Sequence, residues 1–179
     1  MIVLGVDPGT AVTGYGVVSR ARDGLLSLTE CGIIRTSPRA PLPERLRDIY
    51  EGVSDLVDRH APDAVAVEGV FFGKNVRTAV VLGHARGAVL VAAALQRVEV
   101  AEYPPSEVKA AVVGAGRATK DQVAFMVQRL LRLREPPRPE DAADGVAVAL
   151  CHHFRRQGPA FTPSVRLSPV GLRSRRAAP

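Results

Sequence analysis

The stretch that decides the fold is residues 2–19, IVLGVDPGTAVTGYGVVS. Residues 2–6 are apolar and rich in β-branched side chains, and Asp7 closes the run, so a buried strand is predicted to end in a carboxylate. A Pro-Gly-Thr turn follows at once, and residues 15–19 have the composition of a second strand. A third strand is predicted over residues 25–35, after the hairpin signal Asp23-Gly24. These three strands should form an antiparallel meander.

The rest of the chain alternates helix and strand and then becomes helical. An amphipathic helix is predicted over residues 41–61, and Ser106 and Thr119 are candidate N-caps of later helices. The fold class is therefore α/β, a mixed five-stranded sheet flanked by helices, in which connection rules alone place the last two strands beside the meander. The other predicted elements are strands at 63–70 and 98–105, a short helix after Ser106, and helices at 76–97, 120–133 and 139–153.

Length and charge predict one domain and suggest an anionic partner. The chain has 179 residues and a net charge of +6. Residues 158–179 contain four arginines and no acid, which leaves only +2 for residues 1–157. We expect one domain over residues 1–157 and a disordered, Pro-rich, basic tail over residues 158–179. A basic tail fits nucleic-acid binding and a merely solubilising extension equally well.

Cysteine usage and hydropathy predict the compartment. Cys31 and Cys151 are far apart and form no C-x-x-C pair, as expected of free thiols in a reducing cytosol. No basic-then-apolar leader is evident, and the most apolar window, residues 79–95, contains His84 and Arg86 near its middle. We therefore expect a soluble, cytoplasmic protein with no membrane partner.

Acidic side chains occupy positions where apolar ones would be expected. Asp7 and Glu68 each end a buried strand, where an unpaired charge is costly. Asp141 and Asp144 are three residues apart on the last helix, on a face that continues into apolar positions. Acids in a first helical turn also interact favourably with the helix dipole, which explains Glu140 and Asp141 well but Asp144 less well.

Four inward carboxylates would repel one another, and some would be protonated at neutral pH unless cations are bound. Oxygen ligands without His or Cys match Mg²⁺ or Mn²⁺ better than Zn²⁺. Two such ions about 3.5–4 Å apart are a common arrangement for phosphodiester hydrolysis. The placement of the acids thus favours a metal-dependent phosphodiesterase.

Four segments carry a family resemblance: GVDPGTAVTGYGVV (5–18), EGVFFGKNVRTAVVLGHARG (68–87), YPPSEVKAAVVGAGRATKDQV (103–123) and DAADGVAVAL (141–150). Together, in this order, they resemble the RuvC family of Holliday junction resolvases, which has the RNase H-like fold. The resemblance covers about residues 1–157. It implies a Mg²⁺-dependent endodeoxyribonuclease that resolves four-way DNA junctions by paired symmetric nicks in homologous recombination and DNA repair. The products would have 5′-phosphate and 3′-hydroxyl ends.

The same resemblance implies roles for individual residues. Asp7, Glu68, Asp141 and Asp144 would bind two Mg²⁺ ions per subunit, with Asp7 bridging them and Mn²⁺ as a substitute. Lys109 and Lys120 match positions that are basic near the scissile phosphate, where a lysine stabilises charge or holds the DNA backbone; the alternative is a solvated surface lysine. The predicted DNA-binding residues are Phe71, which would stack on an unpaired base, and Lys74, Asn75, Arg77 and Arg86; the alternative for Phe71 is packing in the core.

The resemblance also implies partners. A four-way junction has approximate two-fold symmetry, so a C2 homodimer would place two active sites to match it. The apolar helix predicted at 76–97, with Gly83 and Gly87 four residues apart, is either central to the core or buried in such a subunit interface. A branch-migration motor is a further partner that the family likeness implies.

Two alternatives remain open from the sequence. A YqgF-like nuclease of ribosomal RNA precursors shares the GVDPGT opening, but is usually shorter and lacks the DAAD helix together with VVGAGRATKDQV. A nucleotide-binding module of the actin and sugar-kinase group would use an Asp-x-Gly-Thr turn around ATP phosphates. That module predicts a second phosphate loop and a second domain, for which 179 residues leave no room.

Overall fold

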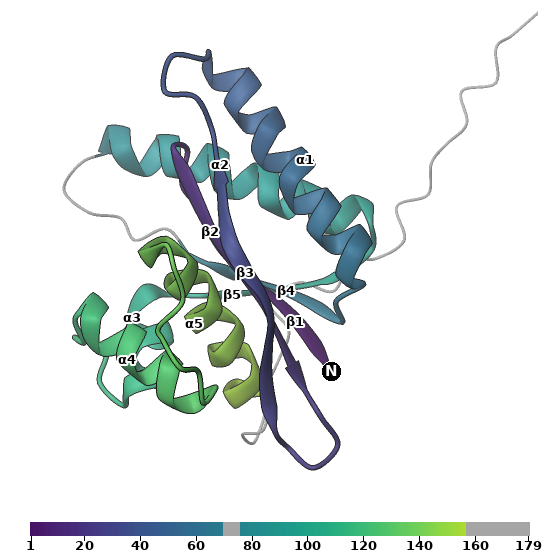
Figure 1. Ribbon diagram of the computed structural model, residues 1–179. Coiled ribbons are helices and arrows are strands. Elements are labelled where there is room, and N and C mark those ends of the chain that lie inside the picture. Colours follow the sequence, from purple (N-terminus) through teal and green to yellow (C-terminus); the bar gives the residue numbers. More distant parts are fainter. Residues whose placement is uncertain (70–75, 157–179) are drawn as a thin grey trace, which may run out of the picture.

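A five-stranded mixed sheet forms the centre of the molecule (Figure 1). The computed structural model describes residues 1–69 and 76–156. Neighbours β1, β2 and β3 are antiparallel, whereas β4 runs parallel to β1 and β5 parallel to β4. This confirms the predicted meander and the mixed sheet. In the order β3-β2-β1-β4-β5, the strands are β3 (Leu26–Arg35), β2 (Val12–Arg20), β1 (Ile2–Asp7), β4 (Ala64–Glu68) and β5 (Glu99–Tyr103).

Helices cover both faces of this sheet (Figure 1). Leu4, Val6 and Val17 point into one core, and Val3 and Val18 point into the other. Successive strand side chains alternate between faces, so β1 reads as a continuous apolar run because both of its faces are covered. One layer consists of α1 (Leu42–His60) and α2 (Val76–Leu95), and the other of α3 (Pro105–Val113), α4 (Lys120–Leu130) and α5 (Glu140–Arg155).

Helix α5 lies directly on the backbone of the meander. A Cβ atom built at Gly5 would be 2.2 Å from the carbonyl oxygen of Gly145, and one at Gly14 would be 1.9 Å from that of Asp141. Only glycine fits at such positions. Gly14 is also the β2 partner of Asp7. The glycines therefore bring the first turn of α5 against the end of β1.

The C-terminal half of α5 is held by two buried histidines. The Nδ1 atom of His152 lies 2.9 Å from the hydroxyl of Tyr103 on β5, and the Nε2 atom of His153 lies 3.0 Å from the carbonyl oxygen of Val18 on β2. Burial lowers the pKa of His152 to about 4 and also lowers that of His153. Both rings are therefore neutral at pH 7, and they act as polar core residues that fix the helix to the sheet.

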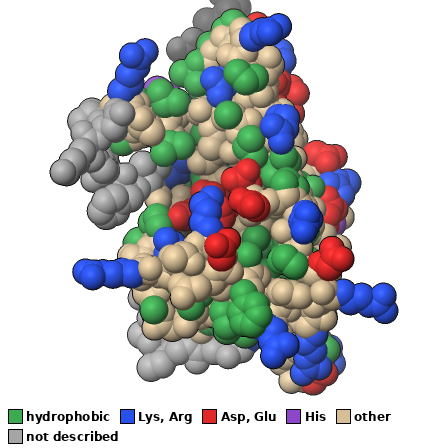
Figure 2. Space-filling view, turned by 60° about the vertical axis from the view of Figure 1, so that its left-hand side comes forward, with side chains coloured by type: hydrophobic (Ala, Val, Ile, Leu, Met, Phe, Trp, Pro, Cys, Tyr) green, Lys and Arg blue, Asp and Glu red, His purple; other side chains and the backbone are tan. Residues whose placement is uncertain are grey.

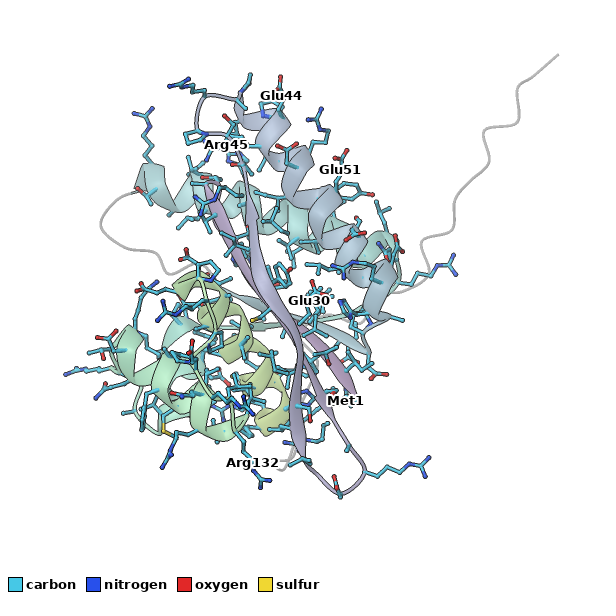
Figure 3. All side chains as sticks on the ribbon, in the orientation of Figure 1. Met1, Glu30, Glu44, Arg45, Glu51 and Arg132 are labelled. Atoms are coloured by element: carbon cyan, nitrogen blue, oxygen red, sulfur yellow. The ribbon has the colours of Figure 1, made fainter. Side chains whose placement is uncertain are left out.

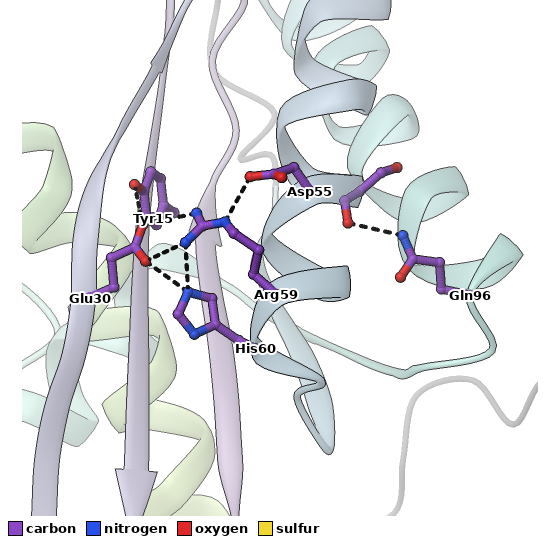
Figure 4. Close-up of polar contacts among 7 residues, drawn as sticks. Tyr15, Glu30, Asp55, Arg59, His60 and Gln96 are labelled. Carbon is purple, nitrogen blue, oxygen red and sulfur yellow. Dashed lines mark hydrogen bonds and ion pairs between the residues drawn. The ribbon is translucent and has the colours of Figure 1, made fainter.

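A polar cluster fixes the edge strand β3 to the end of α1 (Figure 4). Arg59 donates from Nη1 to Glu30 at 2.7 Å and from Nε to Asp55 at 2.8 Å. Tyr15 donates its hydroxyl to Glu30 at 2.9 Å, and His60 lies 2.8 Å from the same carboxylate. The Arg59 hydrogen bonds are the main reason that the pKa of Glu30 is lowered to about 2. These residues stabilise the fold.

Helix α2 contacts α1 and leaves apolar side chains at the surface. Val80, Val91 and Leu95 are 54%, 51% and 67% exposed, and Cβ atoms built at Gly83 and Gly87 would meet open space. Residues 77–95 are long and apolar enough to span a membrane, a property that core helices of soluble proteins share. The exposed stripe shows that α2 is not enclosed in the core of a single subunit.

The structure corrects several local predictions: the helix predicted at 120–133 ends at Leu130, and the strand predicted at 98–105 ends at Tyr103. Ser106 does not cap α3: the helix begins at Pro105, with Pro104 at the N-cap position and no side-chain cap bond. Proline suits the first turn because its missing N–H would have no helical partner there. Strand β2 begins at Val12, three residues before the predicted start, because its ladder with β3 continues to the turn. The α2 helix ends at Leu95 instead of residue 97.

Thr119 is confirmed as the N-cap of α4. Its hydroxyl accepts from the backbone N–H of Gln122 at 3.3 Å, and the Gln122 side chain accepts from the backbone N–H of Thr119 at 2.9 Å. This reciprocal capping box fixes where α4 begins, and therefore the position of Lys120. The tail predicted at residues 158–179 lies outside the described residues.

Candidate active site

Two of the predicted acids lie side by side at one edge of the sheet. Asp7 is the last residue of β1 and Glu68 the last residue of β4. These strands are parallel, with Val6 paired to Val67, so their carboxyl ends meet at the same edge. In open α/β sheets, ligands bind outside the carboxyl ends of such strands.

Helix α5 adds Asp144 to the same place. A pocket of about 170 Å³ is lined by Asp7, Glu68 and Asp144 together with Lys109 of α3 and Lys120 of α4. The remaining lining is Pro105, Val108, Val123 and Ala147. Figure 2 shows acidic and basic side chains crowded together near the centre of one face of the molecule. Five of the six residues predicted to be catalytic therefore share one pocket.

The sixth, Asp141, lies one turn before Asp144 on α5 and does not line the pocket. Its charge nevertheless acts on Asp7 and contributes to the raised pKa of that carboxyl. Glu140 is exposed at the start of the helix, as expected of a residue that interacts only with the helix dipole.

Burial and like charges raise the pKa values of both strand-end acids. For Asp7, burial is the larger cause and Asp144 the next, while Lys120 opposes them; the pKa is about 6. For Glu68, burial acts first, followed by Asp7 and Asp144, and the pKa is about 8. Without added positive charge, this pocket is thus unfavourable for its own carboxylates near neutral pH.

The two lysines supply part of that charge. Lys120 donates from Nζ to Oδ2 of Asp144 at 2.8 Å, and this bond is the main reason that the pKa of Lys120 is raised. The Lys120 side chain is 67% exposed, so its ammonium group remains accessible from solvent. The charge of Lys109 lowers the pKa of Glu68. Both lysines line the acidic pocket, and their contact with a scissile phosphate stays a prediction.

Sequence reasoning missed the residues that hold the turn after Asp7. Thr13 donates its hydroxyl to the carbonyl oxygen of Gly9 at 2.8 Å, and Thr36 donates to that of Thr10 at 2.6 Å. Arg45 donates from Nε to the same Thr10 oxygen at 3.0 Å, from the N-terminal end of α1 (Figure 3). These contacts join residues up to 35 positions apart, and no local sequence pattern signals them.

The carboxylates fit a divalent cation that takes some of its ligands from the protein and others from a phosphate substrate. All four candidate ligands are carboxylates, which match Mg²⁺ and Mn²⁺. In residues 1–69 and 76–156, no three His, Cys, Asp or Glu side chains converge closely enough to enclose one ion. Mg²⁺ usually takes only one or two protein carboxylates and completes its shell with water and phosphate oxygens. Asp7, Glu68 and Asp144, which line the pocket, are enough to supply one or two carboxylates to each ion.

The predicted DNA-binding residues fall into two groups. Phe71, Lys74 and Asn75 lie outside the described residues. Arg77 is exposed in the first turn of α2, while Arg86 forms an ion pair with Glu102 of β5, with Nε 3.0 Å from Oε2. The charge of Arg86 is thus already offset by an acid. The DNA contacts of all five residues stay predictions.

Comparison with known proteins gives consistent matches. The family model of crossover junction endodeoxyribonuclease RuvC matches residues 3–152. The crossover junction endodeoxyribonuclease RuvC of Desulforamulus reducens is 51% identical over 152 residues, which are 85% of this chain and 93% of that protein. The structure of Thermus thermophilus RuvC has a TM-score of 0.80 and 42% identity, over 87% of this chain and 95% of that one.

A second structure, T. thermophilus RuvC in complex with Holliday junction substrate, has a TM-score of 0.79 and 40% identity, again over 87% and 95% of the two chains. These matches confirm the predicted RNase H-like fold. They also favour the resolvase prediction over both alternatives, the ribosomal RNA precursor nuclease and the nucleotide-binding module.

The raised pKa of Glu68 predicts a pH-dependent cost to stability. Between its ordinary value of 4.5 and about 8, the folded protein keeps a proton that the unfolded chain releases, so the free energy of unfolding falls as pH rises through this window. In EDTA at pH 8, Glu68→Gln should therefore be more stable than wild type by about 1–3 kcal/mol. The gain should shrink towards pH 5. Urea unfolding at both pH values measures it.

The matched control is Glu140→Gln, which removes an exposed acid of the same charge outside the pocket. It should not reproduce the pH-dependent gain. If Glu68→Gln were no more stable than wild type at pH 8 in EDTA, the unfavourable electrostatics of the pocket would be refuted.

Proposed function

The chain belongs to the RuvC family of crossover junction endodeoxyribonucleases, and we propose that it resolves four-way DNA junctions by metal-dependent hydrolysis of phosphodiester bonds at the pocket formed by Asp7, Glu68 and Asp144. The observation that carries this proposal is the meeting of three carboxylates from β1, β4 and α5 with two lysines in one pocket at the carboxyl edge of the sheet. A protein that only binds DNA has no need of a cluster of half-buried acids beside a polyanion.

Asp7, Glu68, Asp141 and Asp144 would hold the divalent ions, with Mg²⁺ as the proposed metal, two ions per subunit, and Mn²⁺ as a substitute. When bound, such ions supply a more acidic water and offset the charge that develops on the leaving oxygen. Asp7 is central to this ligand set because it is the acid that the charges of both Asp144 and Asp141 reach. The sheet ladder and the anchored turn after it fix its position.

The protein side chains position the DNA backbone and balance its charge. Lys120 donates to Asp144, one of the carboxylates that would hold a divalent ion, and its exposed ammonium group would also contact the scissile phosphate. Lys109 contacts the same phosphate from the α3 side of the pocket. Water attacks phosphorus and loses a proton, the bond to the 3′ oxygen breaks, and that oxygen takes up a proton from solvent, so the products have 5′-phosphate and 3′-hydroxyl ends.

Paired nicks need two active sites, and the exposed stripe of α2 supports a homodimer. Val80, Val91 and Leu95 line this stripe, and Gly83 and Gly87 leave room for a second helix to approach closely. An apolar helix face of this kind is best explained by a partner subunit related by two-fold symmetry, which would present two pockets to one symmetric junction.

Replacing Asp7 by Asn should abolish junction cleavage while leaving junction binding largely intact. The substitution keeps the side-chain shape but removes the negative charge that the metal requires. Cleavage is measured on a synthetic four-way junction beside a linear duplex of the same sequence, and binding is measured in EDTA by fluorescence anisotropy. Glu140→Gln is the control and should cut like wild type. Junction cleavage by Asp7→Asn at the wild-type rate would contradict the site assignment.

Val91→Asp should convert the dimer to a monomer and reduce paired cleavage. A carboxylate in the middle of the apolar stripe would be buried against its own copy in a two-fold interface. Analytical ultracentrifugation measures the association, and a plasmid-borne cruciform separates paired from single nicks. The control is Leu25→Asp, which replaces an exposed apolar side chain in the β2–β3 hairpin. Equal association of both variants would argue against α2 as the interface.

A further inference from the structure

A group of arginines lies near the active site, at the end of α4 and on the segment that joins it to α5. Residues 129–140 contain four arginines and two glutamates, a net charge of +2. Arg132, Arg134 and Arg138 lie on the connecting segment and are exposed, and Arg129 lies in the last turn of α4. Within the described ranges 1–69 and 76–156, none of the four forms an ion pair with an acid, although Arg129 lies over the ring of Phe125 on α4, 5.8 Å from its centroid.

The backbone of this segment is anchored. Leu131 and Pro137 are buried, and Leu133 packs against the core beneath them. Gln128 donates its side-chain amide to the carbonyl oxygen of Arg134 at 2.9 Å. The apolar side chains thus face the helices while the arginines point to solvent. Anchored in this way, the arginines lose less conformational entropy on binding than side chains on a flexible loop would.

This surface is continuous with the catalytic pocket. A cavity of about 400 Å³ is lined by Arg138 and by residues 136, 137 and 139, and it shares Lys120 and Asp144 with the pocket. Asp121 and Glu140 also line the cavity, so with Asp144 its three acids outnumber its two basic residues and its lining has a net charge of −1. Figure 3 shows Arg132 at the far end of the helical layer. Arg138 thus lies at the cavity beside the active site, and Arg132 lies at the other end of the same connecting segment.

We propose that residues 131–139, here named the arginine loop, contact the phosphates of a duplex arm of the junction as that arm leaves the active site. The inference rests on the proposed function, because it needs a DNA strand in the catalytic pocket. Seven extended residues span at most about 25 Å, which is less than one turn of B-DNA at about 34 Å. Arg132, Arg134 and Arg138 can therefore follow one backbone over part of a turn.

Phosphates are the occupant that these observations favour. Arginines without acidic partners suit phosphate oxygens, to which they donate hydrogen bonds in pairs. A scissile phosphate in the pocket also requires that the DNA on either side continue over the neighbouring surface. Lys120 and Asp144 line both the catalytic pocket and the cavity that Arg138 of the arginine loop lines. A DNA arm that leaves the pocket on this side would therefore meet the loop.

The test compares two triple variants that remove the same charge. Arg132→Gln/Arg134→Gln/Arg138→Gln changes the arginine loop, and the control replaces three exposed arginines on other elements, Arg22→Gln/Arg39→Gln/Arg97→Gln. Junction affinity is measured in EDTA between 50 and 300 mM KCl, a range of about sixfold in salt. Each phosphate that the variant no longer neutralises should reduce the slope of log K against log[salt] by about 0.9.

The loop variant should therefore show a slope about 2 to 3 units less steep than wild type, and the control a smaller change. Its single-turnover cleavage rate at saturating protein in Mg²⁺ should stay at the wild-type value, because the chemistry is unchanged. Each single substitution should reduce the slope by about 0.9, which keeps the test open if the triple variant were unstable. In ethylation interference, a matching set of phosphates on one arm should no longer matter for binding.

Equal slopes for the loop variant and the control would overturn the proposal, whatever the cleavage activity. This outcome differs from failure of the proposed function, in which wild type itself would neither bind nor cut the junction in preference to duplex. A loop variant that bound normally but cut more slowly would also overturn the proposal, since it would place the loop in the chemical step.

Discussion

The constraint that organises the site is the partial burial of Asp7 and Glu68, side by side at the ends of adjacent parallel strands. Desolvation and mutual repulsion raise the pKa values of these carboxyls to about 6 and about 8. A protein that needed only stability would have apolar residues there, as β1 and β4 have at every preceding buried position. The unfavourable free energy of keeping these carboxylates charged is consistent with a site that is complete only when divalent cations are bound between the carboxylates and a phosphate backbone.

The rest of the fold supports this arrangement. Glycines at positions 5, 14 and 145 let α5 lie on the backbone of the meander, so Asp144 reaches the strand ends from a rigid helix. The capping box of α4 sets the position of Lys120, which balances Asp144. Substituting a glycine under α5 would thus displace the Asp144 carboxylate from the pocket as well as disturb the core.

Much of the fold and of the site could be predicted from the sequence. The strand that ends in Asp7 and the repetition of this pattern at Glu68 are local patterns, and they indicated the acidic edge of the sheet directly. The position of Asp141 outside the pocket could not be predicted, because it depends on how far α5 is rotated on the sheet. The Arg45 bond to the Thr10 carbonyl and the Arg86–Glu102 ion pair were also missed, since both join distant segments. The prediction of Ser106 as an N-cap was wrong because the two prolines before it occupy the N-cap and the first helical position.

The central claim is that these acids form a divalent-cation site, and a Mn²⁺ titration of the ¹⁵N-labelled protein followed by NMR tests it most directly. Paramagnetic broadening reports where the ion binds even when affinity is weak. The account predicts that amide signals next to Asp7, Glu68 and Asp144 broaden first in wild type and in Glu140→Gln, and that Glu68→Gln and Asp7→Asn suppress this broadening. Broadening that began elsewhere, or that persisted unchanged in both pocket variants, would contradict it.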